Sequence, residues 1–328
     1  MTSVIEQAPT RPDPTARPAD GPAIVDFTGV SKWYGQVIGL NNLTVRIPAG
    51  VTGLLGPNGA GKSTFLQLAT GQLRPSMGTV RVLGQPVWNN PGMNRWIGLC
   101  PEQDAFYEWM TGWEFILACA HLSGLGGGVA RNAAAQALEY VKMTPNMNRA
   151  IRGYSKGMRQ RTKIAQALVH EPKVLFLDEP MSGTDPLARR DLHDLMLRLG
   201  DEGRSIVLSS HVLYEVQGIT PHILLLNRGK LVAEGHLRQI RDLIDEHPHR
   251  IVIVSPQYRR VAARLVEQDD VVGMELRPRE EAVVIETKAP DTFYQRLPTL
   301  ALAEDTPIHE VYSDDDNLEA VFKYLVSP

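Results

Sequence analysis

The feature of this sequence that most constrains its fold is a glycine-rich loop at residues 56–64, which reads Gly-Pro-Asn-Gly-Ala-Gly-Lys-Ser-Thr. An apolar run typical of a strand precedes it at residues 51–55, and one typical of a helix follows at residues 65–69. Glycines at this spacing let successive backbone N–H groups point inward, and the helix that begins there adds the positive end of its dipole. The loop therefore predicts a cradle for the phosphates of a nucleoside triphosphate.

Two side chains of the loop have further predicted roles. Lys62 is expected to reach the β- and γ-phosphates, and the hydroxyl of Ser63 to bind Mg²⁺. A glycine-rich turn without a ligand is the alternative, but the strand before it, the helix after it and the Lys-Ser pair favour the phosphate site. The predicted nucleotide-binding residues of the loop are Gly56, Pro57, Asn58, Gly59, Ala60, Gly61, Lys62, Ser63 and Thr64.

Length, charge and composition narrow the class of protein. A chain of 328 residues is long enough for a large domain and a small one, and 43% apolar residues are enough for a buried core. The formal net charge of −3 argues against binding nucleic acid through bulk charge, so no nucleic-acid partner is expected. Cys100 and Cys119 are far apart in sequence and predict neither a disulfide nor a zinc site. No apolar run is long enough to span a membrane.

Two carboxylates follow a second strand-like run, residues 174–177. Such a run is typical of a buried parallel strand, which would deliver Asp178 and Glu179 to the edge of the sheet where ligands bind. Asp178 is predicted to hold Mg²⁺ through water, and Glu179 to polarise the attacking water. His211 follows the next such run and is predicted to contact the γ-phosphate. An ordinary strand ending in a polar turn is the alternative.

Three further features are candidates for binding. Tyr34 precedes the loop, and its ring either stacks on adenine or only packs against neighbouring residues. Between Tyr34 and the loop, residues 41–42 (Asn-Asn) are expected to form a turn. Ser155 is a predicted N-cap in a glycine-containing helix start, which is again an anion site. Four aromatic residues in one segment predict either core packing or a partner-binding surface: Phe106, Tyr107, Trp109 and Trp113.

Residues 24 to about 240 resemble the nucleotide-binding domain of ABC transporters, because five motifs occur in the order of that family. They are the adenine-stacking Tyr34, the Walker A loop at 56–64, the Walker B strand at 174–178 with Glu179, the D-loop at 182–186 with Asp185, and the switch histidine His211. The resemblance implies an α/β P-loop NTPase fold of the ABC type, with a helical subdomain at about residues 104–170.

The sequence departs from the family pattern in two places. The signature, usually Leu-Ser-Gly-Gly-Gln, is Tyr-Ser-Lys-Gly-Met at residues 154–158, which resembles ATPases of the exporter branch whose permease is a separate chain. The position of the Q-loop glutamine, directly after Pro101, is taken by Glu102. We assign Glu102 the metal-sensing role, with the adjacent Gln103 as the alternative.

The resemblance implies ATP hydrolysis across a homodimer, with Mg²⁺ and with Lys62, Glu179 and His211 as catalytic residues. Ser155 and Gly157 of the opposite chain would close over the γ-phosphate. The chain would then be a peripheral subunit on the cytoplasmic face of the membrane that energises a separate multi-span permease, with the aromatic segment as the docking surface. The alternative is a soluble ABC ATPase acting on ribosomes or nucleic acid, although the chain has one ATPase domain and no long insertion.

The remaining residues suggest further units. Residues 1–22 are predicted to be a disordered Pro-rich tail before the nucleotide-binding domain at 23–240, and residues 241–250 a linker. Residues 251–328 predict strand, helix, two strands, helix and strand, the order of a small α+β ferredoxin-like domain, then a terminal helix at 317–325. This domain would be a dimer-stabilising or regulatory appendage, or a binding site for an accessory or regulatory protein.

Overall fold

The computed structural model describes residues 23–236, 248–303 and 306–313 of the chain. The predicted tail at 1–22 and the predicted terminal helix at 317–325 lie outside the described residues, as does most of the predicted linker. Within the described ranges, no helix is both long enough and apolar enough to span a lipid bilayer.

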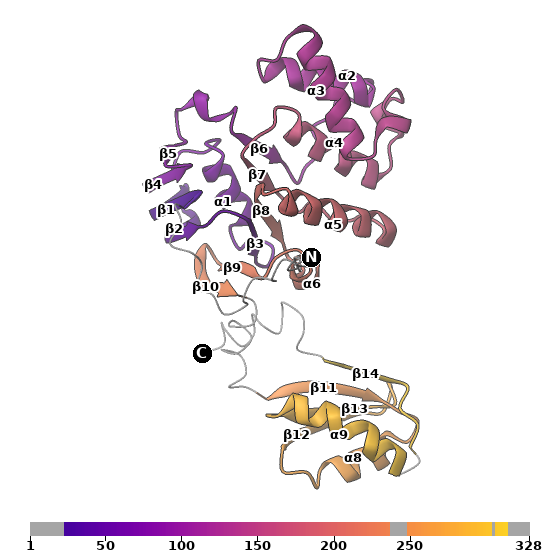
Figure 1. Ribbon diagram of the computed structural model, residues 1–328. Coiled ribbons are helices and arrows are strands. Elements are labelled where there is room, and N and C mark those ends of the chain that lie inside the picture. The colour runs from indigo at the N-terminus through magenta and orange to yellow at the C-terminus, as the bar shows by residue number, and fades with distance from the viewer. Residues whose placement is uncertain (1–22, 237–247, 304–305, 314–328) are drawn as a thin grey trace, which may run out of the picture.

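A six-stranded sheet carries the predicted phosphate loop (Figure 1). Its strand order is β10-β9-β3-β8-β7-β6, and neighbouring strands are parallel except for the antiparallel pair β9 and β10. The five parallel strands are short and mostly buried, as strands covered on both faces of a sheet are, whereas the antiparallel edge strand β10 is partly exposed. Their bounds are β3 Val51–Leu55, β6 Ile97–Cys100, β7 Val174–Leu177, β8 Ser205–Ser210, β9 His222–Asn227 and β10 Lys230–His236.

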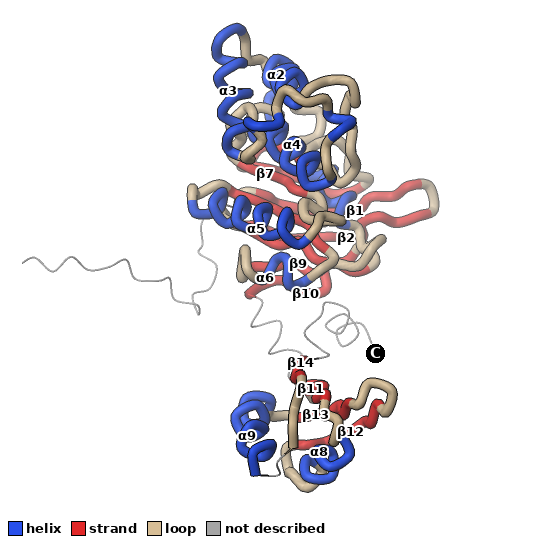
Figure 2. Tube along the Cα trace, turned by 90° about the vertical axis from the view of Figure 1, so that its right-hand side faces the viewer, coloured by secondary structure: helices blue, strands red, loops and turns tan. Residues whose placement is uncertain are grey.

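Alternate residues of this sheet pack into two different cores. Leu175 and Leu177 of β7 pack in the core that includes α5 (Pro186–Asp201) and α6 (Leu213–Gln217). Val174 and Phe176, which point the opposite way, pack in the core that includes α1 (Lys62–Ala69) and a second sheet. Figure 2 shows α5 and α6 on one side of the sheet, with β1 (Val25–Tyr34) and β2 (Val37–Ile47) on the other. The sheet is therefore covered on both faces.

The second sheet is antiparallel, in the order β2-β1-β4-β5. The prediction of a turn at residues 41–42 was wrong, because both asparagines lie inside β2. The pairing jumps from Val30↔Leu43 to Lys32↔Leu40, and Asn42 has a left-handed φ of 47°, which together form a bulge. The asparagines therefore bend a long strand instead of ending it. The bounds are β1 Val25–Tyr34, β2 Val37–Ile47, β4 Met77–Val82 and β5 Gln85–Pro86.

Three helices form the predicted helical region: α2 (Gly112–Leu122), α3 (Gly127–Tyr140) and α4 (Lys156–Leu168). Short 3₁₀ turns lie at Pro91–Met93, Thr144–Asn146 and Ile151–Gly153. The start of α4 is fixed as predicted, since the hydroxyl of Ser155 accepts a hydrogen bond from the Met158 N–H. These helices contribute to the same apolar core as α5 and one face of the six-stranded sheet.

Both cysteines are free thiols, as predicted. Cys100 is fully buried at the end of β6, and burial raises its pKa to about 12. Burial likewise raises the pKa of Cys119 to about 11. Both thiols therefore stay protonated at neutral pH and act as packing groups.

The C-terminal residues form a separate antiparallel sheet, in the order β12-β13-β11-β14. Its elements appear along the chain in the predicted order, and its apolar core lies between the sheet and two helices. The linker was predicted too long, because His249 and Arg250 already pair with β13. The ferredoxin-like class stays a prediction. The bounds are β11 His249–Val254, α8 Tyr258–Leu265, β12 Val271–Arg277, β13 Ala282–Thr287, α9 Pro290–Ala303 and β14 Glu310–Ser313.

Gly98 in β6 tests how closely α4 packs on the sheet. A Cβ atom at Gly98 would lie 2.3 Å from the backbone oxygen of Ala167 in α4, so we expect Gly98→Ala to lower the free energy of unfolding by about 1–3 kcal/mol. The matched control is Gly128→Ala, since a Cβ there meets nothing within 4 Å. Urea denaturation followed by circular dichroism measures both. Equal stabilities for the two variants would contradict the packing described.

Candidate functional site

A cavity of about 470 Å³ lies beside the glycine-rich loop. It brings together residues from the β1–β2 hairpin, the loop itself, the segment after β6 and the end of β7. Glu102 lines it and Gln103 is not among the lining residues, which supports our assignment of Glu102. The lining residues are Tyr34, Val37, Ile38, Gly39, Pro57, Asn58, Gly59, Ala60, Gly61, Lys62, Ser63, Thr64, Glu102 and Glu179.

Two glycines of the loop, Gly56 and Gly61, are required by close backbone contacts. Gly61 is the N-cap of α1 with a left-handed φ of 106°, and a Cβ there would lie 2.6 Å from the oxygen of Gly39. A Cβ at Gly56 would lie 2.5 Å from the oxygen of Leu226 in β9. The loop therefore keeps its path only without side chains at these positions, and the start of α1 faces the cavity.

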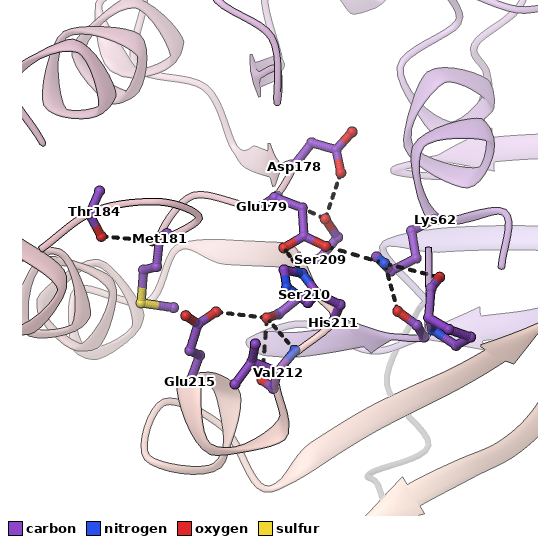
Figure 3. Close-up of polar contacts among 12 residues, drawn as sticks. Lys62, Asp178, Glu179, Met181, Thr184, Ser209, Ser210, His211, Val212 and Glu215 are labelled. Atoms are coloured by element: carbon purple, nitrogen blue, oxygen red, sulfur yellow. Dashed lines mark hydrogen bonds and ion pairs between the residues drawn. The ribbon is translucent and has the colours of Figure 1, made fainter. Parts of the chain in front are cut away.

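Lys62 extends back from α1 across the loop (Figure 3). Its Nζ donates to the oxygen of Gly56 at 2.6 Å and lies 3.2 Å from Oε1 of Glu179. Lys62 and Glu179 are each 7% exposed. A buried ammonium and a buried carboxylate each lose their hydration, and each compensates the charge of the other. Removing either one would leave an uncompensated buried charge, which is destabilising.

The two acids after β7 are held by a serine of the neighbouring strand β8 (Figure 3). The Ser209 hydroxyl donates to Oδ1 of Asp178 at 2.6 Å and accepts from the Glu179 N–H at 2.9 Å. Glu179 has a left-handed φ of 48°, an unfavourable conformation for a residue with a Cβ. Ser209 therefore holds both acids in a strained turn, a role that the sequence did not reveal. A polar residue at the end of an otherwise apolar strand is the signal that could have found it.

His211 lies in the segment between β8 and α6, and its Nδ1 lies 2.8 Å from Oε2 of Glu179. Hydrogen bonds of the neighbouring residue Ser210 hold the backbone of this segment. The Ser210 hydroxyl donates to Oε2 of Glu215 at 2.8 Å, and it accepts from the Val212 N–H at 3.0 Å. Ser210 and Glu215 were also not found from the sequence. The backbone that carries His211 is therefore fixed by hydrogen bonds, and its imidazole contacts the carboxylate of Glu179, which also contacts Lys62.

Tyr34 lies at the mouth of the cavity with 44% of its surface exposed. Its hydroxyl is 3.4 Å from Oγ1 of Thr64 in α1. An exposed ring beside the phosphate cradle is placed to pack against a flat ring system, and this supports the adenine-stacking prediction.

The predicted signature and D-loop residues are not among the residues that line this cavity. The carboxylate of Asp185 accepts from the Ala188 N–H at 2.9 Å and is the N-cap of α5. A Cβ at Gly157 would lie 2.8 Å from the Cβ of Ala188, so the start of α4 lies against the start of α5. Ser155 and Gly157 therefore form a second helix start, apart from the loop of their own chain.

The oxygen ligands near the cavity suit Mg²⁺ shared with a ligand. Among the residues described, no three His, Cys, Asp or Glu side chains are grouped so that they could hold a metal. Ser63 and Glu102 line the cavity, and Asp178 lies directly before Glu179. Mg²⁺ in phosphate sites is commonly held by one or two protein oxygens together with phosphate oxygens and water. The residues present fit that kind of site.

Comparison with known proteins places this geometry in a family. Residues 40–182 match the ABC transporter family. An uncharacterized ABC transporter ATP-binding protein of Nostoc sp. is 41% identical over 63% of each chain, so the match spans less than two thirds of that relative. The Nod factor export ATP-binding protein I of Rhizobium meliloti is 30% identical over 87% of this chain and 88% of its own.

A solved structure supports the fold. A dimeric ATP-binding cassette in a post-hydrolysis state, bound to ADP and phosphate, superposes with a TM-score of 0.60 at 22% identity. The match covers 65% of this chain and 99% of that one. The predicted P-loop fold of the ABC type is confirmed.

Ser209 provides a test of the site. We expect Ser209→Ala to lower the rate of ATP hydrolysis by about 10–100-fold, because both acids lose the group that orients them. The control is Ser205→Ala at the opposite end of β8, which should stay within about twofold of the parent. A steady-state phosphate-release assay measures both rates. Equal rates in Ser209→Ala and the parent would show that the acids hold their position without it.

Proposed function

This chain belongs to the family of ABC transporter ATP-binding proteins, and from that premise we propose that it hydrolyses ATP to energise a separate membrane-spanning permease, as part of an exporter. The observation that carries the proposal is the contact of Glu179 with both Lys62 and His211 beside the phosphate cradle. The export relative supports the direction of transport.

The residues at the cavity have different roles in ATP hydrolysis. The backbone N–H groups of the loop and the Lys62 ammonium bind the β- and γ-phosphates and offset their charge. Glu179, which lies between Lys62 and His211, polarises the attacking water. His211 holds that water in line with the γ-phosphate, and its bond to Glu179 keeps the two groups together. Glu179 and His211 are therefore already paired before ATP binds.

The metal site is built from the oxygen groups beside the loop. Ser63 would supply a hydroxyl ligand, Asp178 would hold the ion through water, and Glu102 would sense the ion from the segment after β6. The chemistry that Mg²⁺ would supply there is neutralisation of the charge on the β- and γ-phosphates. Ser209 supports this site because its hydroxyl bond fixes the carboxylate of Asp178.

Hydrolysis requires two copies of the chain. Ser155 begins a second helix start that is not part of the cavity of its own chain. In a head-to-tail homodimer, Ser155 and Gly157 of one copy close over the γ-phosphate bound to the other, with Asp185 next to the shared nucleotide. The dimeric state of the solved cassette supports this arrangement.

The permease docks on the aromatic segment after Glu102. Phe106 and Trp113 pack against the core, whereas Tyr107 and Trp109 are 57% and 73% exposed. The rings of Tyr107 and Trp109 are in contact, with centroids 5.3 Å apart. Exposed aromatic pairs are common anchors of protein interfaces. The subunit would then lie at the cytoplasmic face of the membrane, and the C-terminal sheet would be available to an accessory or regulatory protein.

Glu179→Gln tests the catalytic assignment. The amide has nearly the same shape as the carboxylate but cannot act as a base, so we expect hydrolysis to fall by about 100-fold or more while ATP binding persists. The ATP-bound variant should accumulate as a dimer in size-exclusion chromatography with light scattering. Glu139→Gln, on the exposed face of α3, is the control. Hydrolysis near the parent rate in Glu179→Gln would contradict the assignment.

Trp109→Ala tests the docking surface. Loss of the ring from the centre of an interface should reduce the permease recovered with the tagged chain by about tenfold, with unchanged ATPase activity of the isolated chain. Trp88→Ala is the matched control, since Trp88 is 43% exposed and lies outside the aromatic segment. Equal recovery with both variants would place the docking surface elsewhere.

A further inference from the structure

Lys163, two turns into α4, is a buried cation that the proposed mechanism does not use. It is 2% exposed, although it lies on a helix whose other buried residues are mostly apolar or small. Burying an ammonium group costs free energy through lost hydration, and apolar side chains of similar size commonly replace buried ion pairs without loss of stability. Packing alone therefore does not account for a lysine at this position.

The ammonium group of Lys163 contacts three oxygens of one segment. It donates to the backbone oxygens of Pro101 at 3.0 Å and Glu102 at 2.7 Å, and it lies 3.1 Å from Oδ1 of Asp104. An ammonium has three N–H donors, so these contacts use its full capacity. Bonds from a charged donor to a carbonyl are stronger than neutral ones, and all three hold the stretch directly after β6.

This stretch carries Glu102 to the cavity. The oxygen of the preceding residue, Cys100, accepts from the Asp178 N–H at 2.8 Å. Three consecutive carbonyl groups are therefore fixed, one by the strand that carries the acids and two by Lys163. With its backbone held at Pro101 and at its own carbonyl, Glu102 has little freedom beyond its side-chain rotations, and it lines the cavity together with Ser63 and Glu179.

A second cation of α4 provides a contrast. Arg159 lies one turn before Lys163 and forms a two-bond contact with Glu108, at 2.7 and 2.8 Å. It also lies 3.6 Å from Asp104. No hydrogen bond joins it to the backbone of Pro101 or Glu102 among the contacts of the described residues. Two cations on one helix thus hold the same segment, but Lys163 alone of this pair holds the backbone of Glu102.

We propose that Lys163 is a positioning residue that fixes Glu102 at the cavity and thereby sets the affinity of the nucleotide site for its divalent cation. The inference rests on the proposed function, in which Glu102 senses Mg²⁺. Lys163 acts through Glu102 and touches neither nucleotide nor metal.

The test measures metal binding without turnover. The full chain carrying Glu179→Gln is saturated with ATP and titrated with Mn²⁺, and bound metal is followed by electron paramagnetic resonance. We expect Lys163→Met to weaken Mn²⁺ binding by about tenfold, as removal of a group that orients a metal ligand commonly does. ATP affinity without metal should stay within about twofold. Arg159→Met is the matched control and should bind Mn²⁺ as the parent does.

A double-mutant cycle separates positioning from a general loss of structure. If Lys163 acts through Glu102, adding Lys163→Met to Glu102→Ala should not weaken Mn²⁺ binding further. Should Lys163→Met fail to fold, Asp104→Asn removes the carboxylate partner of the ammonium and should lower Mn²⁺ affinity about threefold or more.

The outcomes distinguish the inference from the function on which it rests. Unchanged Mn²⁺ affinity in Lys163→Met or its substitute, an equal loss in Arg159→Met, or additive losses with Glu102→Ala would overturn the inference alone. Failure of the parent to bind Mn²⁺ in the presence of ATP would overturn the inference and the proposed function together.

Discussion

The contact between Lys62 and Glu179 is the interaction on which the site depends. It joins the loop after β3 to the turn after β7 and is nearly sealed from water. The strand between these two, β8, supplies Ser209 to the acids and leads to His211. Three neighbouring strand ends therefore meet at Glu179. The parallel sheet aligns them, because the carboxyl ends of its strands lie along one edge.

Sequence patterns predicted the parts of this arrangement that depend on local chemistry. The glycine-rich loop, the acids after β7 and the helix cap at Ser155 each follow from a few adjacent residues, and the structure has the corresponding elements in those places. Two residues whose role depends on a distant partner were not found from the sequence. Ser209 is 30 residues from Glu179, and Lys163 is 61 residues from Glu102. A serine in a strand or a lysine in a helix has no local signal for such a role.

The errors have a common physical origin in tertiary pairing. The asparagines at residues 41–42 have turn propensity, yet the pairing of β1 with β2 continues past them and turns them into a bulge. The linker was predicted too long because pairing with β13 extends β11 to His249. In the segment after β6, packing likewise decides which aromatic residues are exposed, since Phe106 packs against the core while Trp109 is exposed. In each case long-range contacts decided between conformations that the local sequence left open.

The account is tested most directly by identifying what the chain binds in the membrane. Tagged protein carrying Glu179→Gln would be purified with ATP and Mg²⁺ from detergent-solubilised membranes of the organism that produces it, and its partners identified by mass spectrometry. We predict recovery of a multi-span membrane protein in stoichiometric amount. Recovery of ribosomes or nucleic acid without a membrane protein would contradict the account and favour a soluble ABC ATPase.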